Sequence, residues 1–372
     1  MSRIDDLVKE LCPDGVMGVP LGDLCTFNRG RWIKASELHE GTIPVVTSSQ
    51  NVSAWHDESN RRGETIVVAS SGAYAGFVSF WNEPIYVSNA FSVDPNESSG
   101  IVPKFLFHVL RRRQREINAM ASVAGVPNVY GKDLARMVVQ IPPLAVQREI
   151  VRILDQFTQL EAELEAELEV RCRQYEYYRC REMRFSGSVA RIPLGELVQV
   201  KAGTAVSKRS IQENPGPYPV INSGREPLGY IGEYNTEDNP IGITSRGAGA
   251  GSITWCEGRY YRGSLNYGVI IKGTNELDVR FLYHSLRNMQ SELRALCSFQ
   301  GIPALNKASL ERLVLPLPDM AVQMKVVSIL DKFDALVNDL NSGLPAEIAA
   351  RRKQYEYYRD RLLTFPEKGA SA

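Results

Sequence analysis

The sequence predicts an α+β protein with an internal duplication: two α/β domains are joined by two long, antiparallel, coiled-coil-like helical regions in a pseudo-twofold arrangement. Three observations predict this fold. The letters QYEYYR occur twice, from Gln174 and again from Gln354. Short runs rich in Val, Ile, Thr and aromatic residues, bounded by turn residues, fill two separate stretches. A long segment with apolar residues three and four positions apart follows each stretch.

The repeat extends over nearly the whole chain. VPLGDL from Val19 matches IPLGEL from Ile192, and KFLFHVLR from Lys104 matches RFLYHSLR from Arg280. Further matches, in the same order, pair GTIPVVTS with GPYPVINS, ASSGAYAGFVSF with TSRGAGAGSITW, GVPNVYGKDL with GIPALNKASL, and AVQREIVRILDQF with AVQMKVVSILDKF. The offset drifts only from 173 (192 − 19) to 180 (354 − 174). The chain is therefore two copies of one unit.

The first part of each copy is expected to be a compact domain of strands and helices. In copy one the runs TIPVVTSS, ETIVVASSG, FVSFW, PIYVS and FSVDP are typical of strands, because β-branched and aromatic residues stand between Gly, Pro, Asn and Ser. The segment PKFLFHVLRRRQREINAMA predicts a helix with Phe105, Leu106, Val109 and Leu110 on one face. The segment DVRFLYHSLRNMQSELRALC predicts its counterpart in copy two.

The second part of each copy is expected to be a long helix. Between Val146 and Glu182 there is no Gly or Pro, and apolar residues such as Ile150, Leu154 and Phe157 recur at spacings of three and four. Copy two begins alike, but NSGLP at residues 341–345 predicts a break, because Gly and Pro end helices. The two helical regions can bury their apolar seams against each other as an antiparallel pair.

Composition excludes several classes of protein. Equal numbers of basic and acidic residues, 43 each, argue against a polybasic nucleic-acid binder that acts alone. No apolar run reaches the roughly 18 residues of a membrane span, and MSRIDDLVKELC lacks the apolar core of a signal peptide, so a cytoplasmic protein is expected. The six cysteines form no CxxC pair, and the four histidines form no local cluster, so free thiols and no metal site are expected. The histidines are His39, His56, His108 and His284.

The predicted architecture points to DNA. Two similar domains that helices hold at a fixed distance can measure the spacing between two sites on a polymer. Dimeric DNA readers use such a fixed separation to bind two half-sites. A duplicated single chain would imitate such a dimer. Because the two domains differ in sequence, the two half-sites are expected to differ as well.

The same residues carry a resemblance to a known family. The repeated QYEYYR helix ends, the AVQREIVRILDQF-type segments, the opening ELCPDGV and the PLGEL motifs resemble the specificity subunits of type I restriction-modification systems over essentially the whole chain. The resemblance implies an N-terminal segment plus a first target recognition domain at 1–144 and a central helical spacer region at 145–185. It implies a second target recognition domain at 186–318 and a C-terminal helical spacer region at 319–372.

The resemblance also implies partners. A specificity subunit binds double-stranded DNA, two methyltransferase (modification) subunits and, in the full enzyme, restriction subunits that carry motor and nuclease. The partners methylate adenine N6, one adenine in each half-site, and cleave DNA, so this chain is expected to be non-catalytic. It is expected to hold no cofactor, while S-adenosylmethionine, ATP and Mg belong to the partner subunits. The sequence agrees, since it has no Asn-Pro-Pro-aromatic motif and no GxxxxGK[ST] phosphate loop.

Three loops in each copy combine Gly with polar or basic side chains that can reach base edges and phosphates. They pair 28–34 with 201–209, 47–51 with 222–225, and 70–74 with 245–249. The candidate DNA-binding residues are Arg29, Arg31, Lys34, Ser48, Gln50, Ser70, Ser71, Tyr74, Lys201, Lys208, Arg209, Asn222, Arg225, Ser245 and Arg246. Ordinary solvated turns remain the alternative interpretation of these loops.

The repeated QYEYYR segment predicts two equivalent surfaces for one kind of partner. Successive residues on a helix are 100° apart, so one tyrosine of each set points away from the other two. Aromatic residues and Arg are enriched at protein interfaces. The candidate partner-binding residues are Gln174, Tyr175, Tyr177, Tyr178, Arg179, Gln354, Tyr355, Tyr357, Tyr358 and Arg359. The alternative is that these tyrosines serve only the packing of the helices.

Two other functions stay open at this point. The duplicated domains could bind proteins in an adaptor that has no role at DNA. An enzyme acting alone could use the loop RGAGAGS at residues 246–252, although its third Gly comes too early for a full GxGxxG motif.

Overall fold

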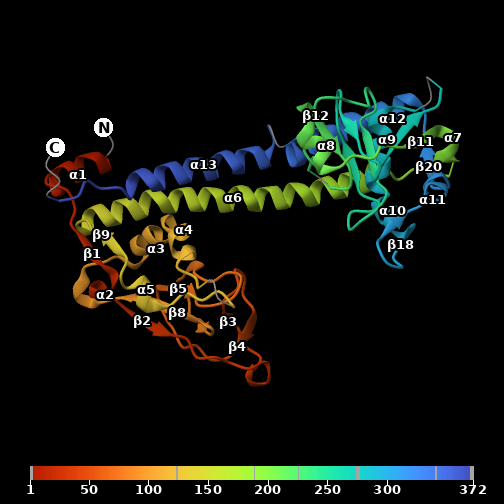
Figure 1. Cartoon of the computed structure of the whole chain (residues 1–372). Helices are drawn as coiled ribbons and strands as arrows, with labels where there is room; N and C mark the ends of the chain where they lie inside the picture. The colour runs from red at the N-terminus through yellow and green to blue at the C-terminus, as the bar shows by residue number, and fades with distance from the viewer. Residues whose placement is uncertain are drawn as a thin grey trace. The chain divides into compact units, whose positions relative to one another are not determined.

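The computed structural model describes residues 3–122, 125–187, 189–224, 226–273, 277–339 and 342–368 (Figure 1). The chain forms two compact units: unit 1 contains residues 1–164 and 348–372, and unit 2 contains residues 165–347. Each unit combines the globular part of one copy with helical segments from both copies. The predicted α+β class and the duplication are confirmed by the strands and helices of the two units.

Strands of unit 1 form two main sheets. A four-stranded antiparallel sheet has the order β2 (Cys25–Arg29), β8 (Ala90–Pro95), β5 (Thr65–Ala69) and β6 (Val78–Trp81). A three-stranded sheet has the order β4 (Ala54–His56), β3 (Ile43–Val46) and β7 (Tyr86–Val87), and β3 pairs with β7 in parallel. β1 (Gly18–Pro20) pairs with β9 (Val138–Gln140). The central strand β5 is buried along its whole length, which explains its continuous apolar run.

Unit 1 also contains short helices. These are α1 (Arg3–Leu11), α2 (Leu21–Leu24), η1 (Ala35–Glu37), η2 (Glu97–Ser99), α3 (Pro103–Arg112), α4 (Gln114–Ala119) and α5 (Gly131–Leu134). Figure 1 shows α3 and α4 between the long helix α6 and the strands of this unit. The expected single helix is divided at Arg113, where φ is −91° and ψ is 19°. Both pieces contribute to the core, because Phe105, Leu106 and Ile117 are fully buried.

Unit 2 repeats this arrangement. Its four-stranded sheet has the order β11 (Val198–Ala202), β17 (Asn266–Ile271), β14 (Ile241–Thr244) and β15 (Ile253–Trp255). Its three-stranded sheet has the order β13 (Tyr230–Ile231), β12 (Pro215–Ile221) and β16 (Tyr261–Arg262). The two-stranded pairs are β10 (Ala190–Pro193) with β20 (Val314–Leu317) and β18 (Cys297–Ser298) with β19 (Ala304–Leu305). The helices are α7 (Leu194–Leu197), α8 (Lys208–Glu213), α9 (Val279–Asn288), α10 (Gln290–Ala295) and α11 (Lys307–Glu311).

Three long helices complete the two units: α6 (Leu144–Glu182), α12 (Met320–Asn338) and α13 (Leu344–Leu362). In unit 1 the first part of α6 lies against α13 in antiparallel orientation, because Phe157 stacks on Tyr358 while Glu161, further along α6, pairs with Arg352, earlier in α13. In unit 2 the second part of α6 packs on α12. The predicted break is found between α12 and α13, although Leu340 and Asn341 lie outside the described residues.

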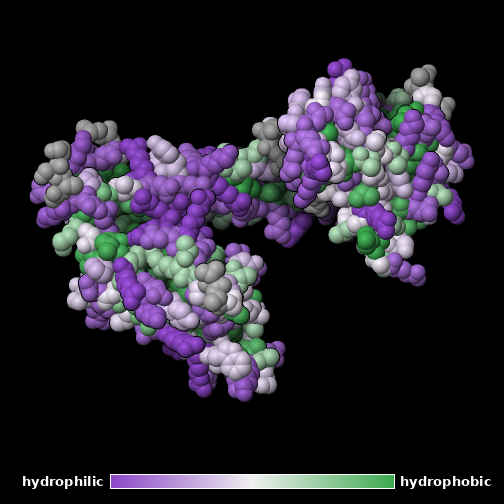
Figure 2. Space-filling model, viewed as in Figure 1, coloured by the Kyte–Doolittle hydropathy of each residue, from purple (hydrophilic) through white to green (hydrophobic). Residues whose placement is uncertain are grey.

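The surface of each unit is largely polar. Figure 2 shows hydrophilic residues over most of the visible face, with hydrophobic groups in smaller patches. Among the helices that the structure describes, none combines the length and the apolar character that a membrane crossing requires. The six cysteines are all free thiols, as expected.

Candidate nucleic-acid interface

In unit 1 the three candidate loops are held to one short segment, residues 87–90. The N–H of Gly30 donates to the Ala90 carbonyl at 2.8 Å. The hydroxyl groups of Ser48 and Ser70 donate to the Asn89 carbonyl at 2.5 and 2.7 Å. One loop from each of three distant parts of the chain therefore meets at the same edge of the unit.

Asn89 is the centre of this arrangement. Its φ of +51° lies in the left-handed region, which Asn adopts more readily than most residues. Its side-chain Nδ2 donates to Ser71 Oγ at 2.9 Å, and the N–H of Ser71 donates to Ser48 Oγ at 3.3 Å. Sequence reasoning missed Asn89; the only signal was an Asn within the otherwise strand-like run PIYVSNAFSV.

Unit 2 builds the same edge around residues 262–266. The N–H of Gly203 donates to the Asn266 carbonyl at 3.1 Å. The N–H of Leu265 donates to Asn222 Oδ1 at 3.0 Å, and the N–H of Ser245 donates to the Leu265 carbonyl at 2.8 Å. The three paired loops therefore converge in both copies, although their side chains differ.

A buried arginine supports the edge in unit 2. Arg262 is 3% exposed and donates to Asn266 Oδ1 at 2.6 Å, to the Asn239 carbonyl at 2.8 Å and to the Ile241 carbonyl at 3.1 Å. Burial among these neutral oxygens lowers the pKa of its guanidinium from the ordinary value. Arg61 has a similar task in unit 1, where it donates to the Asn28 carbonyl at 3.0 Å. Neither arginine was singled out from the sequence.

The candidate DNA-binding residues fall into two groups by exposure. The exposed ones are Arg29, Arg31, Lys34, Gln50, Tyr74, Lys201, Lys208, Arg209 and Arg246. Ser48, Ser70, Ser71 and Asn222 are partly buried, Ser245 is buried, and Arg225 lies outside the described residues. The exposed group can reach a ligand, whereas the serines and Asn222 hold the loops together.

Two exposed candidates from different loops share one surface pocket. Gln50 of the second loop and Tyr74 of the third loop line it together with Pro127. A Gln amide beside an aromatic ring can offer both a hydrogen bond and an apolar contact to a base edge. In the first loop, Lys34 Nζ lies 5.9 Å from the centre of the exposed Trp32 ring.

The glycine-rich loop at residues 246–252 is a pair of tight turns. Gly247 and Gly251 have φ of +102° and +80°, and their counterparts Gly72 and Gly76 have φ of +82° and +88°. Only Gly adopts this conformation without strain, so the glycines are needed for the backbone path in both copies. This geometry favours a retained turn over a nucleotide-binding loop.

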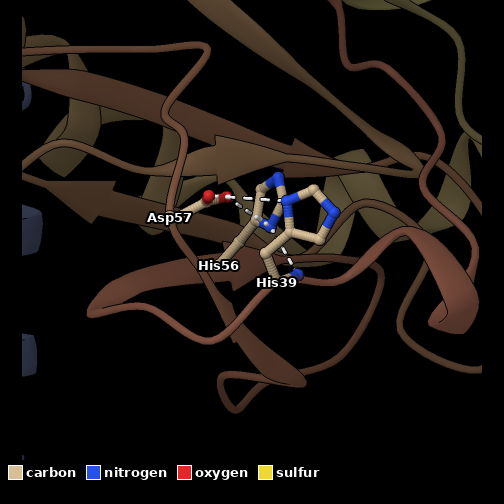
Figure 3. A group of neighbouring side chains, drawn as sticks. All are labelled: His39, His56 and Asp57. Atoms are coloured by element: carbon tan, nitrogen blue, oxygen red, sulfur yellow. Dashed lines mark hydrogen bonds and ion pairs between the residues drawn. The ribbon is translucent and has the colours of Figure 1, made fainter.

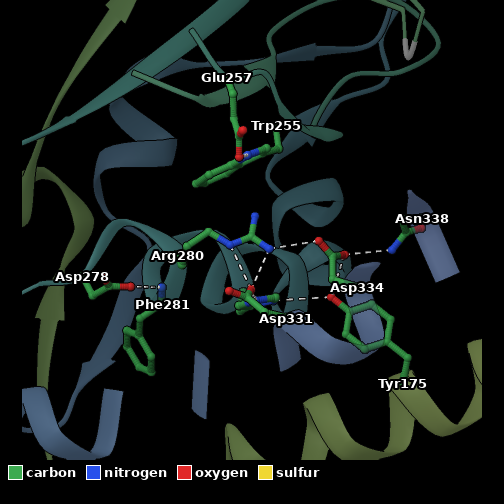
Figure 4. Close-up of polar contacts among 10 residues, drawn as sticks. Tyr175, Trp255, Glu257, Asp278, Arg280, Phe281, Asp331, Asp334 and Asn338 are labelled. Atoms are coloured by element: carbon green, nitrogen blue, oxygen red, sulfur yellow. Dashed lines mark hydrogen bonds and ion pairs between the residues drawn. The ribbon is translucent and has the colours of Figure 1, made fainter. Parts of the chain in front are cut away.

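A polar cluster joins the globular part of unit 2 to its long helices (Figure 4). Arg280 on α9 donates to Asp331 on α12 at 2.6 Å and to Asp334 at 3.1 Å. The buried His284 contacts Asp331 Oδ1 through Nε2 at 2.7 Å, and the Tyr175 hydroxyl donates to Asp334 at 3.2 Å. Burial lowers the pKa of His284 and raises the pKa of Tyr175, so both are neutral near pH 7.

Unit 1 contains the corresponding cluster, with fewer polar contacts among the residues that the structure describes. The Tyr355 hydroxyl lies 3.2 Å from His108 Nδ1, as Tyr175 lies beside His284 in unit 2. His108 Nε2 is 3.5 Å from Asp155, and Lys104 Nζ is 2.9 Å from the same carboxylate. The first tyrosine of each QYEYYR segment therefore contacts α3 in unit 1 or α9 in unit 2.

The middle tyrosine of each QYEYYR segment is the most exposed of its three tyrosines. Tyr177 and Tyr357 are each 62% exposed. Tyr175 is buried, and Gln174, Tyr178, Arg179, Tyr355, Tyr358 and Arg359 are partly buried, while Gln354 is exposed. Arg179 and Arg359 stack over the rings of Tyr175 and Tyr355 at 5.2 and 5.7 Å. The middle tyrosine is the one that each segment presents to solvent.

The expectation that the four histidines form no cluster was wrong for two of them. His39 and His56 come together with Asp57 at the edge of β4 (Figure 3), with the two ring centres 5.6 Å apart. His56 Nδ1 accepts the backbone N–H of His39 at 3.2 Å, and Asp57 lies 3.4 Å from His39 Nδ1. Pairing of β3 with β4 brings the residues close, which their sequence spacing did not reveal. Because the His56 nitrogen already accepts a hydrogen bond, the cluster serves to hold the 35–41 loop on β4.

Relatives share this organisation along the chain. A family model described as the type I restriction modification DNA specificity domain matches residues 13–170 and again 189–350. The type I restriction enzyme EcoR124I/EcoR124II specificity subunit of Escherichia coli is 36% identical, over 99% of this chain and 98% of that protein. A putative type I restriction enzyme specificity subunit of Haemophilus influenzae is 27% identical, over 93% of this chain and 94% of that protein.

Solved structures share the fold. The type I restriction-modification S subunit from M. genitalium has a TM-score of 0.69 at 19% identity, over 94% of this chain and 96% of that one. The two matches of the family model coincide with the two copies of the repeat, and the Escherichia coli relative aligns from end to end. The chain therefore belongs to the family of type I restriction-modification specificity subunits, the non-catalytic components of these systems.

Proposed function

We propose that this chain binds an asymmetric bipartite DNA target, with one half-site for each recognition domain. The observation that carries the proposal is the repeated edge. In both units the same three loops meet at one segment, but side chains at matched positions of that edge differ, as Ser71 and its counterpart Arg246 illustrate. A shared backbone frame with different side chains suits two half-sites of different sequence.

The proposed recognition domains span 1–144 and 186–318, and the proposed helical spacer regions span 145–185 and 319–372. Two methyltransferase subunits bind at equivalent surfaces, centred on the exposed Tyr177 and Tyr357. These subunits methylate adenine N6, and restriction subunits cleave DNA. S-adenosylmethionine, ATP and Mg bind to those partners. The zero net charge of this chain fits DNA affinity that is shared with the partners.

The first test is a base-resolution methylome. Cells that carry this chain with its neighbouring methyltransferase are compared with cells that lack the chain. We expect a new motif with one methylated adenine in each half and a fixed gap between the halves. A stable complex with the methyltransferase but no new motif would overturn the proposal in favour of a protein adaptor.

Loop variants assign each half-site to a domain. Arg246→Ala should relax the sequence of one half of the motif, and Gln50→Ala should relax the other half, because the two residues lie in different units. Loss of about 1–3 kcal/mol of base discrimination is expected at the affected position. A change in both halves from one substitution would contradict independent half-site reading.

The helical regions are proposed to set the gap. Inserting one more EAEL unit into LEAELEAELE of α6 adds four residues, or about 6 Å of helix at 1.5 Å per residue. That length corresponds to between one and two base pairs of about 3.4 Å. The gap in the methylated motif should lengthen while both half-site sequences stay the same. A control that replaces one EAEL with EAKL keeps the helix length and should leave the gap unchanged.

A further inference from the structure

Both units expose an aliphatic side chain, between α4 and α5 or between α10 and α11, at matched positions of the repeat. Val126 and Ile302 are both 62% exposed, although each stands close to buried residues of the core. Each is preceded by a Gly and followed by a Pro, in GVPNV and GIPAL. We call these two short turns the apolar tips. Single exposed aliphatic residues are common, and Val138 and Val314 form a second matched pair on β9 and β20. The tips are singled out by their place beside the third loop of each unit.

Backbone hydrogen bonds hold the apolar tips beside the third loop of each unit. The N–H of Gly72 donates to the Pro127 carbonyl at 2.9 Å, and the N–H of Gly247 donates to the Pro303 carbonyl at 2.9 Å. Ser71 also forms a bridge with Asn128, as Arg246 does with Ala304. The same backbone contacts therefore place each tip at the edge where the candidate loops meet.

The backbone of each tip turns sharply and is anchored behind the exposed residue. Gly125 and Gly301 have φ of +83° and +90°, a region that favours Gly. Three residues after each exposed side chain, Val129 and Leu305 are buried in the core. The tip is thus an anchored turn whose aliphatic side chain is mostly exposed.

Other apolar groups lie close to the tips. Tyr74, 46% exposed, lines a pocket with Pro127 in unit 1. In unit 2, Phe299 is 67% exposed and precedes Ile302 by three residues. Figure 2 shows a hydrophobic patch at the end of unit 2 where Figure 1 places β18 and α10. Each interface edge therefore combines cationic side chains with an apolar projection.

The tips stay alike while their neighbours differ. Beside Val126 the third loop carries Ser71, and beside Ile302 it carries Arg246. A residue that read sequence would be expected to change with the half-site, as the loops do. A shared aliphatic residue suits a task common to both half-sites. Under the proposed function, the common feature of the half-sites is a target adenine that must leave the base stack before it can be methylated.

We propose that Val126 and Ile302 are apolar wedges that press against the bases of each half-site, independently of sequence, and open the stack near the target adenine. The inference rests on the proposed function. Apolar side chains are used in this way by DNA-bending proteins, which unstack base steps with Phe, Leu, Ile, Met or Pro. The cationic residues of the neighbouring loops supply the phosphate contacts that hold the wedge in place.

The test uses the full complex with its methyltransferase subunits and the motif from the methylome. Two DNA duplexes carry 2-aminopurine in place of one or the other target adenine, because its fluorescence rises when the base leaves the stack. Val126→Ser should reduce this rise at the half-site of unit 1 only, and Ile302→Ser at that of unit 2 only. Binding should weaken by roughly tenfold for each variant, as expected when one aliphatic contact is lost.

Matched variants separate the wedge from its alternatives. Val126→Ile and Ile302→Val keep an aliphatic tip and should keep binding, fluorescence and motif. Val138→Ser and Val314→Ser remove valines that are 52% and 41% exposed on β9 and β20, and should change neither fluorescence nor affinity. Thermal unfolding should be unchanged in all six variants, because each side chain is exposed.

Three results would overturn the wedge. These are wild-type fluorescence in both Ser variants, a changed recognition sequence in the Val/Ile exchange, or loss of a methyltransferase subunit from a Ser variant, which would make the tip a protein contact. Failure of the proposed function itself looks different, because the wild-type chain would then produce no bipartite motif at all.

Discussion

The two polar clusters make a matched pair for one quantitative prediction. Asp331 in unit 2 and Asp155 in unit 1 occupy the same position of the repeat, within ILDKF and ILDQF. The Asp331 carboxylate accepts a 2.7 Å hydrogen bond from the buried His284. Asp155 is 3.5 Å from the buried His108, whose Nε2 has no hydrogen-bond partner within the described residues. Removal of the two carboxylates should therefore have unequal effects.

The expected magnitudes follow from these contacts. Asp331→Ala leaves the His284 N–H unsatisfied inside the protein, which costs about 1–3 kcal/mol. It also removes one of two carboxylates from Arg280; because Asp331 is partly exposed, this adds only about 0.5–1 kcal/mol. Asp155→Ala creates no new unsatisfied group and loses only the half-exposed pair with Lys104, about 0.2–1 kcal/mol. We expect losses of about 1.5–4 kcal/mol in unit 2 and below about 1 kcal/mol in unit 1.

Hydrogen exchange read by mass spectrometry measures the two units separately, which a single unfolding curve of a two-unit protein does not. The protection of amides in α9 and α12 reports on Asp331→Ala, and that of α3 reports on Asp155→Ala. Asp331→Asn is the control, because its side-chain oxygen still accepts from His284 and most of the stability should return. The reasoning is refuted if Asp155→Ala costs as much as Asp331→Ala, or if the latter costs under about 0.5 kcal/mol.

Three further outcomes are expected. Arg262→Met leaves several buried carbonyl groups without a hydrogen-bond donor and should destabilise unit 2 by about 2–4 kcal/mol. The loss would be measured as reduced amide protection in β14 and β17. Burial lowers the pKa of His108 and His284, so below about pH 6.5 the unfolded chain binds protons that the folded chain does not. Stability should stay level above that pH and fall beneath it, and His108→Gln should reduce the slope in denaturant titrations between about pH 7.5 and 5.5. Tyr177→Ala and Tyr357→Ala should each remove one methyltransferase subunit, measured by light scattering, without changing Tm; a double variant that retains both subunits would exclude this surface.

The long-range organisation could be predicted because it depends on features that are local in sequence. Helix α6 follows from a segment without Gly or Pro and a seam at spacings of three and four. The end of α12 near Asn338 follows from the Gly and Pro a few residues later. Because of the duplication, each predicted strand or helix is represented by two different sequences. An element that is ambiguous in one copy is supported by the sequence of the other.

The details of the interface depend on contacts between distant residues and could not be predicted. The role of Asn89 arises because two of the three loops meet its carbonyl and amide, while the first loop contacts the neighbouring Ala90. His39 and His56 are 17 positions apart, yet strand pairing brings them together. Arg262 looked like one more basic residue, but its burial makes it a support for the loops. The sequence located the loops, and only the structure separates side chains that hold a loop from those that face outward.

Unit 1 is built from two segments that are far apart in the sequence, and this affects its folding during synthesis. Its core includes Leu363 and Phe365 near the end of the chain, and the N–H of Val16 donates to the Pro366 carbonyl at 2.9 Å. These two bonded residues are 350 positions apart (366 − 16), a distance that a ribosome covers in about 20–70 s at roughly 5–20 residues per second. Unit 2, a continuous stretch from 165 to 347, can form its core in that interval. Synthesis of unit 1 therefore starts first and ends last. Part of its apolar core stays uncovered until α13 and the residues after it have been synthesised.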